Sequence, residues 1–177
     1  MTTESKAIKQ IKTALSSSTK AQLLEGIKLS RAHANRETFE LMLKLLKETD
    51  EAEVEAAIIQ FLNDLKDESS VEPLIAALQD EAMRYYHAFL IAAFWQSAID
   101  GSPYIEIFVK KAIEGEYMVS LEALTVVENF DSSFPDDLLM ELDADLMEAI
   151  ESEEQEEKRN LLISMKEVVS KLPVEGE

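Results

Sequence analysis

Apolar residues recur every three or four positions through most of this chain, a spacing that predicts amphipathic α-helices. The clearest stretch, Val71–Gln96, is predicted to form two helices folded back on each other across a turn near Asp80. The first helix, Val71–Gln79, has one apolar face, whereas the second, Glu81–Gln96, is apolar almost all the way round, which is typical of a helix with several neighbours. No segment alternates with a period of two, so the pattern predicts an all-α fold.

The same apolar pattern returns along the chain at a nearly constant interval. A shift of 32 residues places Phe39, Met42, Leu43 and Leu46 on Val71, Leu74, Ile75 and Leu78, and Val54, Ile58, Ile59 and Leu62 on Tyr86, Leu90, Ile91 and Phe94. A shift of 33 places these last four on Val119, Ala123, Leu124 and Val127. Because two nearly equal shifts align the core positions of three segments, the sequence predicts an internal repeat of two helices.

Polar breaks between the apolar stretches divide the chain into five predicted helix pairs. These are Glu4–Leu15 with Lys20–Ser30, Glu37–Lys47 with Glu51–Leu65, Val71–Gln79 with Glu81–Gln96, Tyr104–Glu114 with Tyr117–Asn129, and Pro135–Ile150 with Glu153–Lys171. Ser152 and Gln155 have capping-box spacing at the start of the last helix. One helix pair cannot bury both its faces alone, so we expect stacked pairs to form a single solenoid domain over residues 1–173 with a concave surface. Residues 174–177 are expected to be a disordered tail.

One segment resembles a known repeat family. The run from Leu65 to Asp80, LKDESSVEPLIAALQD, followed by Met83 and Arg84, resembles a HEAT repeat of the short bacterial kind. The resemblance implies a right-handed α–α superhelix whose second helices line the concave side. The turn between Asp80 and Arg84 is about two residues shorter than the family pattern, and the neighbouring pairs have Ala52 and Tyr117 at the position of Arg84.

The resemblance also implies which side chains face the concave groove. The candidates on the third pair are Arg84, Tyr85, Ala88, Ala92 and Trp95, and the fourth pair adds Tyr117, Met118 and Glu128. Trp, Tyr and Arg are enriched at the energetic centres of protein interfaces, and the two alanines leave room for a partner's side chain. The alternative is that Trp95 and Tyr85 fill gaps between adjacent helices while Arg84 pairs with a nearby carboxylate.

Charge narrows the choice of partner. The chain has 36 acidic and 17 Lys or Arg residues, a formal net charge of -19, so its field repels the phosphate backbone of a nucleic acid. The charge is uneven, because residues 1–31 hold six bases against two acids, whereas residues 131–157 hold twelve acids and no base. Both regions fit solvated helix faces that aid solubility. They also fit attraction of a basic partner, or of a second copy head-to-tail.

Motifs of known enzymes are missing from the sequence. The chain has no Cys, its two histidines, His33 and His87, lie far apart, and no zinc-peptidase, nucleophile-elbow or phosphate-loop pattern occurs. We therefore expect no catalytic residues, no metal and no cofactor, with His87 as a core residue and His33 at the surface. A signal peptide and a membrane span are also missing, so a cytoplasmic protein that does not enter a membrane is expected.

These features together predict a non-catalytic scaffold or adaptor that binds a protein or peptide in its groove. One alternative is an acidic inhibitor of a basic toxin or nuclease. A second is a nucleic-acid protein of the kind represented by HEAT-like alkyl-base DNA glycosylases, whose concave faces use Trp, Tyr and Arg. A third is a chaperone-like or lyase-like HEAT protein that handles a chromophore or a client subunit.

Overall fold

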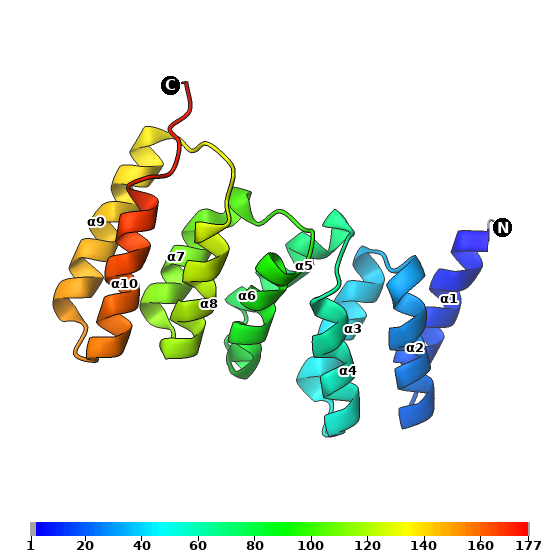
Figure 1. Cartoon of the computed structure of the whole chain (residues 1–177). Coiled ribbons are helices and arrows are strands. Elements are labelled where there is room, and N and C mark those ends of the chain that lie inside the picture. The colour runs from blue at the N-terminus through cyan, green and yellow to red at the C-terminus, as the bar shows by residue number, and fades with distance from the viewer. Residues whose placement is uncertain (1–2, 177) are drawn as a thin grey trace. The chain divides into compact units, whose positions relative to one another are not determined.

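The computed structural model describes residues 3–176, and side chains from residue 6 onward. Within this part the chain is helical, with no β-strand beyond one isolated bridge (Figure 1). It divides into two compact units, residues 1–100 and 101–177, each with its own core. None of the described helices has both the length and the apolar character needed to cross a membrane.

The first unit contains three helix pairs in two layers. Its helices are α1 (Thr3–Leu15), α2 (Lys20–His33), α3 (Arg36–Glu48), α4 (Ala52–Leu62), α5 (Val71–Gln79) and α6 (His87–Gln96), with short 3-10 helices η1 (Glu68–Ser70) and η2 (Glu81–Tyr86). The first helices α1, α3 and α5 pack on one another in chain order, and the second helices α2, α4 and α6 do the same (Figure 1). Each pair therefore stacks on the next along both layers.

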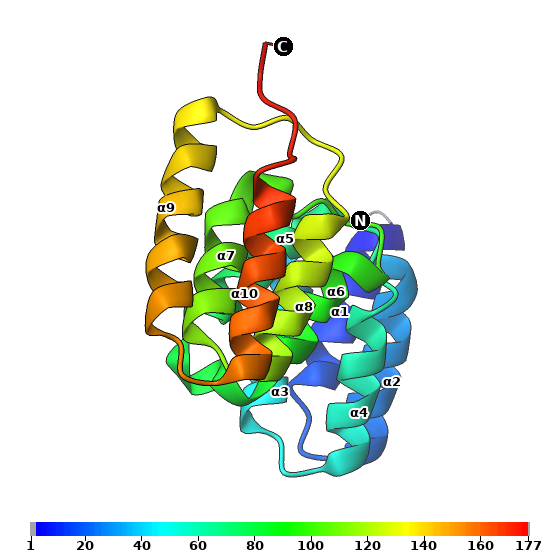
Figure 2. The ribbon, with the colours of Figure 1, turned by 60° about the vertical axis from the view of Figure 1, so that its left-hand side comes forward.

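The second unit repeats this arrangement with two pairs. A short 3-10 helix, η3 (Ser102–Tyr104), leads into α7 (Ile105–Glu114), which pairs with α8 (Tyr117–Glu128), and α9 (Asp136–Ser152) pairs with α10 (Glu156–Val169). Within this unit α7 contacts α9 and α8 contacts α10, so it also has two layers (Figure 2). The division into two-helix pairs is confirmed for all five.

The repeat positions form the core. Of the twenty residues aligned by the two shifts, all are buried except Ile59 and Val119, which are half-buried. Burial of an apolar side chain contributes about 1.5–3 kcal/mol relative to leaving it exposed, so these positions hold neighbouring helices together. The predicted repeat register is therefore the one in which the helices pack.

Ion pairs follow the same interval in the first unit. Lys20 Nζ, at the start of α2, lies 2.6 Å from Glu53 Oε2 in the first turn of α4. Arg31 Nη1, in the last turn of α2, lies 2.5 Å from Asp64 Oδ2, two residues after α4 ends. Lys47 reaches Asp80 at 2.7 Å, so three of these pairs join residues 33 apart. Two further ion pairs between neighbouring helix pairs are Lys12–Glu37 and Arg36–Glu72. Exposed ion pairs contribute little stability because water and salt screen them, but each of these five runs from a cation of one helix pair to an acid of the next.

Three details differ from the expectation. Glu81–Tyr86 is a 3-10 helix, because the Asp80 side chain accepts the Ala82 N–H at 2.9 Å and the Asp80 carbonyl accepts the Met83 N–H, which closes a tight turn. The predicted cap at Ser152 is wrong, since Ser152 ends α9 and bonds back to Glu148, while α10 begins at Glu156.

The third detail is the chain end. Val174, in the segment expected to be disordered, forms a parallel bridge with Phe134. Phe134 donates its N–H to the Pro173 carbonyl at 2.8 Å and accepts from the Glu175 N–H at 2.9 Å. These bonds hold residues 173–175 against the segment that leads into α9, whereas Glu177 lies outside the described residues.

Candidate functional site

Exposed large apolar side chains of the first unit come from a single segment. Among the side chains described between residues 6 and 100, these are Tyr85, Phe89 and Trp95, with exposed fractions of 77%, 42% and 41%. Tyr85 lies on η2, one residue before its end. The other two lie on α6, where Ala88 and Ala92 fall between them on the helical surface. We call these five residues the α6 aromatic face.

A buried tyrosine positions the outermost ring of this face. Tyr86 is buried, and its hydroxyl donates to Glu55 Oε2 of α4 at 2.8 Å. The rings of Tyr85 and Tyr86 meet edge to face, with centroids 5.0 Å apart and planes at 86°, a favoured aromatic geometry. The bond to α4 fixes Tyr86, and Tyr86 in turn restricts the exposed ring of Tyr85.

Burial, reinforced by the bond to the Glu55 carboxylate, raises the pKa of Tyr86 to about 12 from its ordinary 10.0. We therefore expect a near-ultraviolet absorbance titration of the folded protein to show a late tyrosine ionisation near pH 12. Above about pH 10 the unfolded chain loses this proton first, so the free energy of unfolding should decrease as the pH rises towards 12. The late step should vanish in Tyr86→Phe, and a single transition near pH 10 in the unsubstituted protein would contradict the assignment.

The other predicted residues of the third pair lie at different depths. Arg84 is exposed and, within the described chain, forms no ion pair, so the predicted alternative of a carboxylate partner has no support. Ala88 is half-buried, whereas Ala92 is only 6% exposed. Ala92 therefore offers little contact area itself. Its small side chain leaves space above the helix between Phe89 and Trp95.

The sequence-based interpretation missed Phe89. Its signal was its position four residues after Tyr85, one helical turn further along the same face. The expected patch of Tyr85, Arg84 and Trp95 therefore gains a third aromatic ring.

Two hydrogen bonds hold the chain after α6 against the segment between α4 and α5. Ala98 donates its N–H to the Leu65 carbonyl at 3.0 Å, and Asp100 donates its N–H to the Glu68 side chain at 3.2 Å.

Predicted residues of the fourth pair lie on α8 of the second unit. Tyr117 and Met118 in its first turn are 42% and 51% exposed, and Glu128 at its last position is exposed. The turn before α8 requires glycine, since a Cβ on Gly115 would lie 2.5 Å from Val119 Cγ1 and 2.6 Å from a backbone oxygen. The tight turn places Tyr117 directly at the start of the helix. The α6 and α8 residues belong to separate units, and each group is described within its own.

The chain was compared with known proteins in three ways. Protein-family models, curated proteins and solved structures give no match to this chain.

Neither histidine lies in a metal-binding group. Within residues 3–176 no cluster of three or more His, Asp or Glu side chains could hold a metal ion. His87 is buried, with Nε2 3.3 Å from the Asp80 carbonyl oxygen, as a core histidine would be. His33, expected at the surface, is exposed at the last position of α2.

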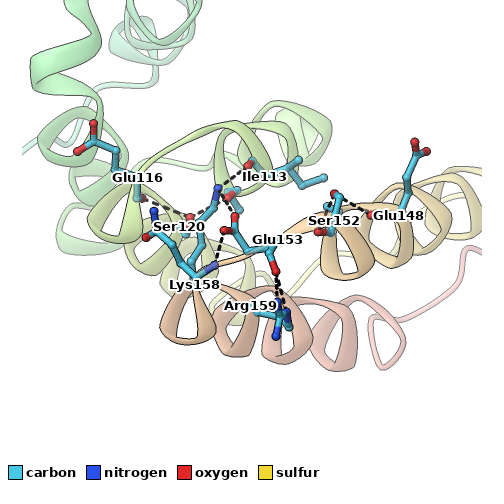
Figure 3. Close-up of polar contacts among 11 residues, drawn as sticks. Ile113, Glu116, Ser120, Glu148, Ser152, Glu153, Lys158 and Arg159 are labelled. Atoms are coloured by element: carbon cyan, nitrogen blue, oxygen red, sulfur yellow. Dashed lines mark hydrogen bonds and ion pairs between the residues drawn. The ribbon is translucent and has the colours of Figure 1, made fainter.

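A second polar feature joins the loop between α9 and α10 to the end of α7. The Lys158 ammonium donates to the Ile113 carbonyl at 2.8 Å and lies 2.9 Å from Glu153 Oε2 (Figure 3). Lys158 is only 9% exposed, and Arg159 donates to the Glu153 carbonyl. The Gln155 N–H and then Lys158 hold the pKa of Glu153 below its ordinary value. We call these contacts the Lys158 clip.

Proposed function

We propose that this chain is a non-catalytic adaptor and that the α6 aromatic face binds a protein or peptide partner. The observation that carries the proposal is the concentration of exposed Tyr85, Phe89 and Trp95 on one short segment. Aromatic side chains bury large area at low entropic cost, and interface hot spots are enriched in Trp and Tyr. The small Ala88 and Ala92 between them give a partner's side chain access to the ring faces.

The repeat geometry supports the same proposal. Two-layer stacking within each unit is what a HEAT-like solenoid requires, and in such a solenoid the second helices line a concave binding surface. We infer a right-handed superhelix of this kind, in which the second helix of each pair lines the binding surface. Within the second unit, Tyr117, Met118 and Glu128 are the corresponding candidates on a second helix, α8.

A quantitative pull-down from the source lysate tests the proposal. The tagged protein is compared with the triple variant Tyr85→Ala, Phe89→Ala, Trp95→Ala, and bound proteins are quantified by mass spectrometry. Hot-spot truncation costs about 2 kcal/mol or more, so at least one specific partner should fall by about tenfold or more in the variant. These side chains are exposed, so circular dichroism should show an unchanged helical fold.

The matched control removes equally exposed apolar side chains elsewhere. Met140, Met147 and Ile163 are 66%, 49% and 39% exposed on α9 and α10, and their replacement by alanine should leave that partner's recovery unchanged. Equal loss in both variants would indicate nonspecific stickiness. No loss in the α6 variant, with its fold intact, would rule out this face as the binding surface.

A further inference from the structure

A groove lies between α7 and α9 in the second unit, apart from the α6 aromatic face. It has a volume of about 490 Å³. Its base includes Ile113 and Ala149, both half-buried, together with the buried side chains of Val109 and Leu142. A groove of this kind presents apolar surface along the length of α7, whose ten residues span about 15 Å.

The rim of the groove is acidic. Glu106 on α7 and three acids on α9, Glu141, Asp145 and Glu148, line it, and all four are exposed. Within the described chain none of these four forms an ion pair. The one cation lining the groove is Lys110, whose Nζ lies 3.8 Å from Glu114 on its own helix. The rim thus has an excess of negative charge that no cation of this unit neutralises.

The charge of the whole second unit reinforces this local excess. Residues 101–177 hold 20 of the 36 acids and six of the 17 bases, a formal charge of -14 out of -19. A cleft with one sign of charge and low-dielectric walls concentrates the field and attracts oppositely charged groups. A basic ligand is therefore drawn to this groove in preference to the first unit, whose formal charge is only -5.

Beside the end of the groove, an ammonium group of this chain contacts two residues that line a neighbouring cavity. Ile113, Ala149 and Ser152 also line a neighbouring cavity of about 280 Å³, which extends to Glu153. There the Lys158 ammonium bonds to the Ile113 carbonyl in the last turn of α7 and to Glu153 (Figure 3). The C-terminus of a helix carries partial negative charge, which stabilises a cation. The Lys158 clip shows that this end of α7 accommodates a nearly buried lysine.

We propose that the α7–α9 groove binds a basic amphipathic helix of a partner protein. The apolar base takes the partner's apolar stripe, and its lysine or arginine side chains reach the four rim carboxylates. Binding of an amphipathic helix in an apolar groove is a recurring mode of peptide recognition, and charge complementarity determines which helices enter. The length of α7 matches about three turns of such a helix. This surface is independent of the α6 aromatic face.

Fluorescence anisotropy with a designed peptide tests the proposal on the full chain. The probe is a fluorescein-labelled helical peptide of about 14 residues with leucine on one face and lysine on the other. We compare the groove variant Glu141→Gln, Asp145→Asn, Glu148→Gln with a control variant, Asp131→Asn, Glu151→Gln, Glu167→Gln. Both remove three exposed charges by the same substitutions, but the control residues do not line the groove.

The groove variant should weaken peptide binding about tenfold or more, whereas the control variant should weaken it less than about threefold. A scrambled peptide of the same composition, which lacks an apolar face, should bind at least about tenfold more weakly. The α6 triple variant should bind the peptide as the unsubstituted protein does, which separates this test from that of the adaptor surface. Equal weakening by both charge variants would overturn the proposal, as would equal binding of the scrambled peptide. Displacement of the peptide by spermine at an equal concentration of amino groups would also overturn it, because it would indicate a polyamine site.

Discussion

Replacing Phe108 by alanine is expected to lower the free energy of unfolding by about 3–5 kcal/mol. Phe108 on α7 is fully buried. The centroid of its ring lies 5.9 Å from that of Phe130, and the centroids of the Phe130 and Phe134 rings lie 6.1 Å apart. Truncation removes the ring that joins α7 to the segment before α9 and leaves a cavity that a packed core cannot close. Urea unfolding should be followed by circular dichroism, because the single tryptophan, Trp95, lies in the other unit.

The matched control is Phe89→Ala on α6. The same atoms are removed from a side chain that is 42% exposed, so the loss should be about 1 kcal/mol or less. If both substitutions lowered the free energy of unfolding equally, the assignment of Phe108 to a packed core would be wrong.

Replacing Lys158 by methionine is expected to cost about 3 kcal/mol. Methionine keeps the aliphatic length of the side chain but leaves the Glu153 carboxylate and the Ile113 carbonyl without their ammonium donor. The Lys158 and Glu153 side chains are only 11% and 15% exposed, so water replaces that donor poorly. Chemical denaturation at neutral pH measures the loss. Lys171→Met removes an exposed ammonium by the same substitution and should change the stability by less than about 0.5 kcal/mol.

The effect of Lys158 should depend on pH in a defined direction. The pKa of Glu153 is lowered in the folded state, so the ionised carboxylate stabilises the fold above its ordinary pKa of 4.5. This contribution is lost as the pH falls through the lowered value. The difference between the unsubstituted protein and Lys158→Met should therefore shrink below about pH 4. A difference that stays constant down to pH 2 would mean that Glu153 takes no part in the clip.

The helix pairs could be predicted from the sequence because every helix needs an apolar face, and the spacing of apolar residues reveals that face. The predicted bounds of Val71–Gln79 are those observed, and Glu37–Lys47 falls one residue short of α3 at each end. Polar breaks, such as Thr49-Asp50, separated the elements correctly. The repeat register was equally accessible, since the residues that align by shift are the ones that the stacked helices bury.

Features that depend on the loops could not be predicted. Apolar spacing does not distinguish a six-residue 3-10 helix from the first turns of an α-helix, so η2 was interpreted as part of one helix. The burial of Lys158 depends on the path of residues 153–155 between α9 and α10, which no periodicity describes. The α7–α9 groove was missed for a related reason. Its acids were visible in the sequence, but the apolar base between them exists only once the two helices pack.

The ion pairs of the first unit also bear on how such a chain can lengthen. Arg36 and Lys47 of the second pair reach Glu72 and Asp80 of the third, and 32 residues before those acids the second pair itself has Glu40 and Glu48. If residues 36–67 were duplicated in tandem and in frame, Glu40 and Glu48 of the second copy would take the places of Glu72 and Asp80. The Arg36 and Lys47 side chains of the first copy would then find acids within reach. The joint between the two copies would need no new charged residue. Gene duplication could extend this part of the molecule without first evolving a compatible boundary.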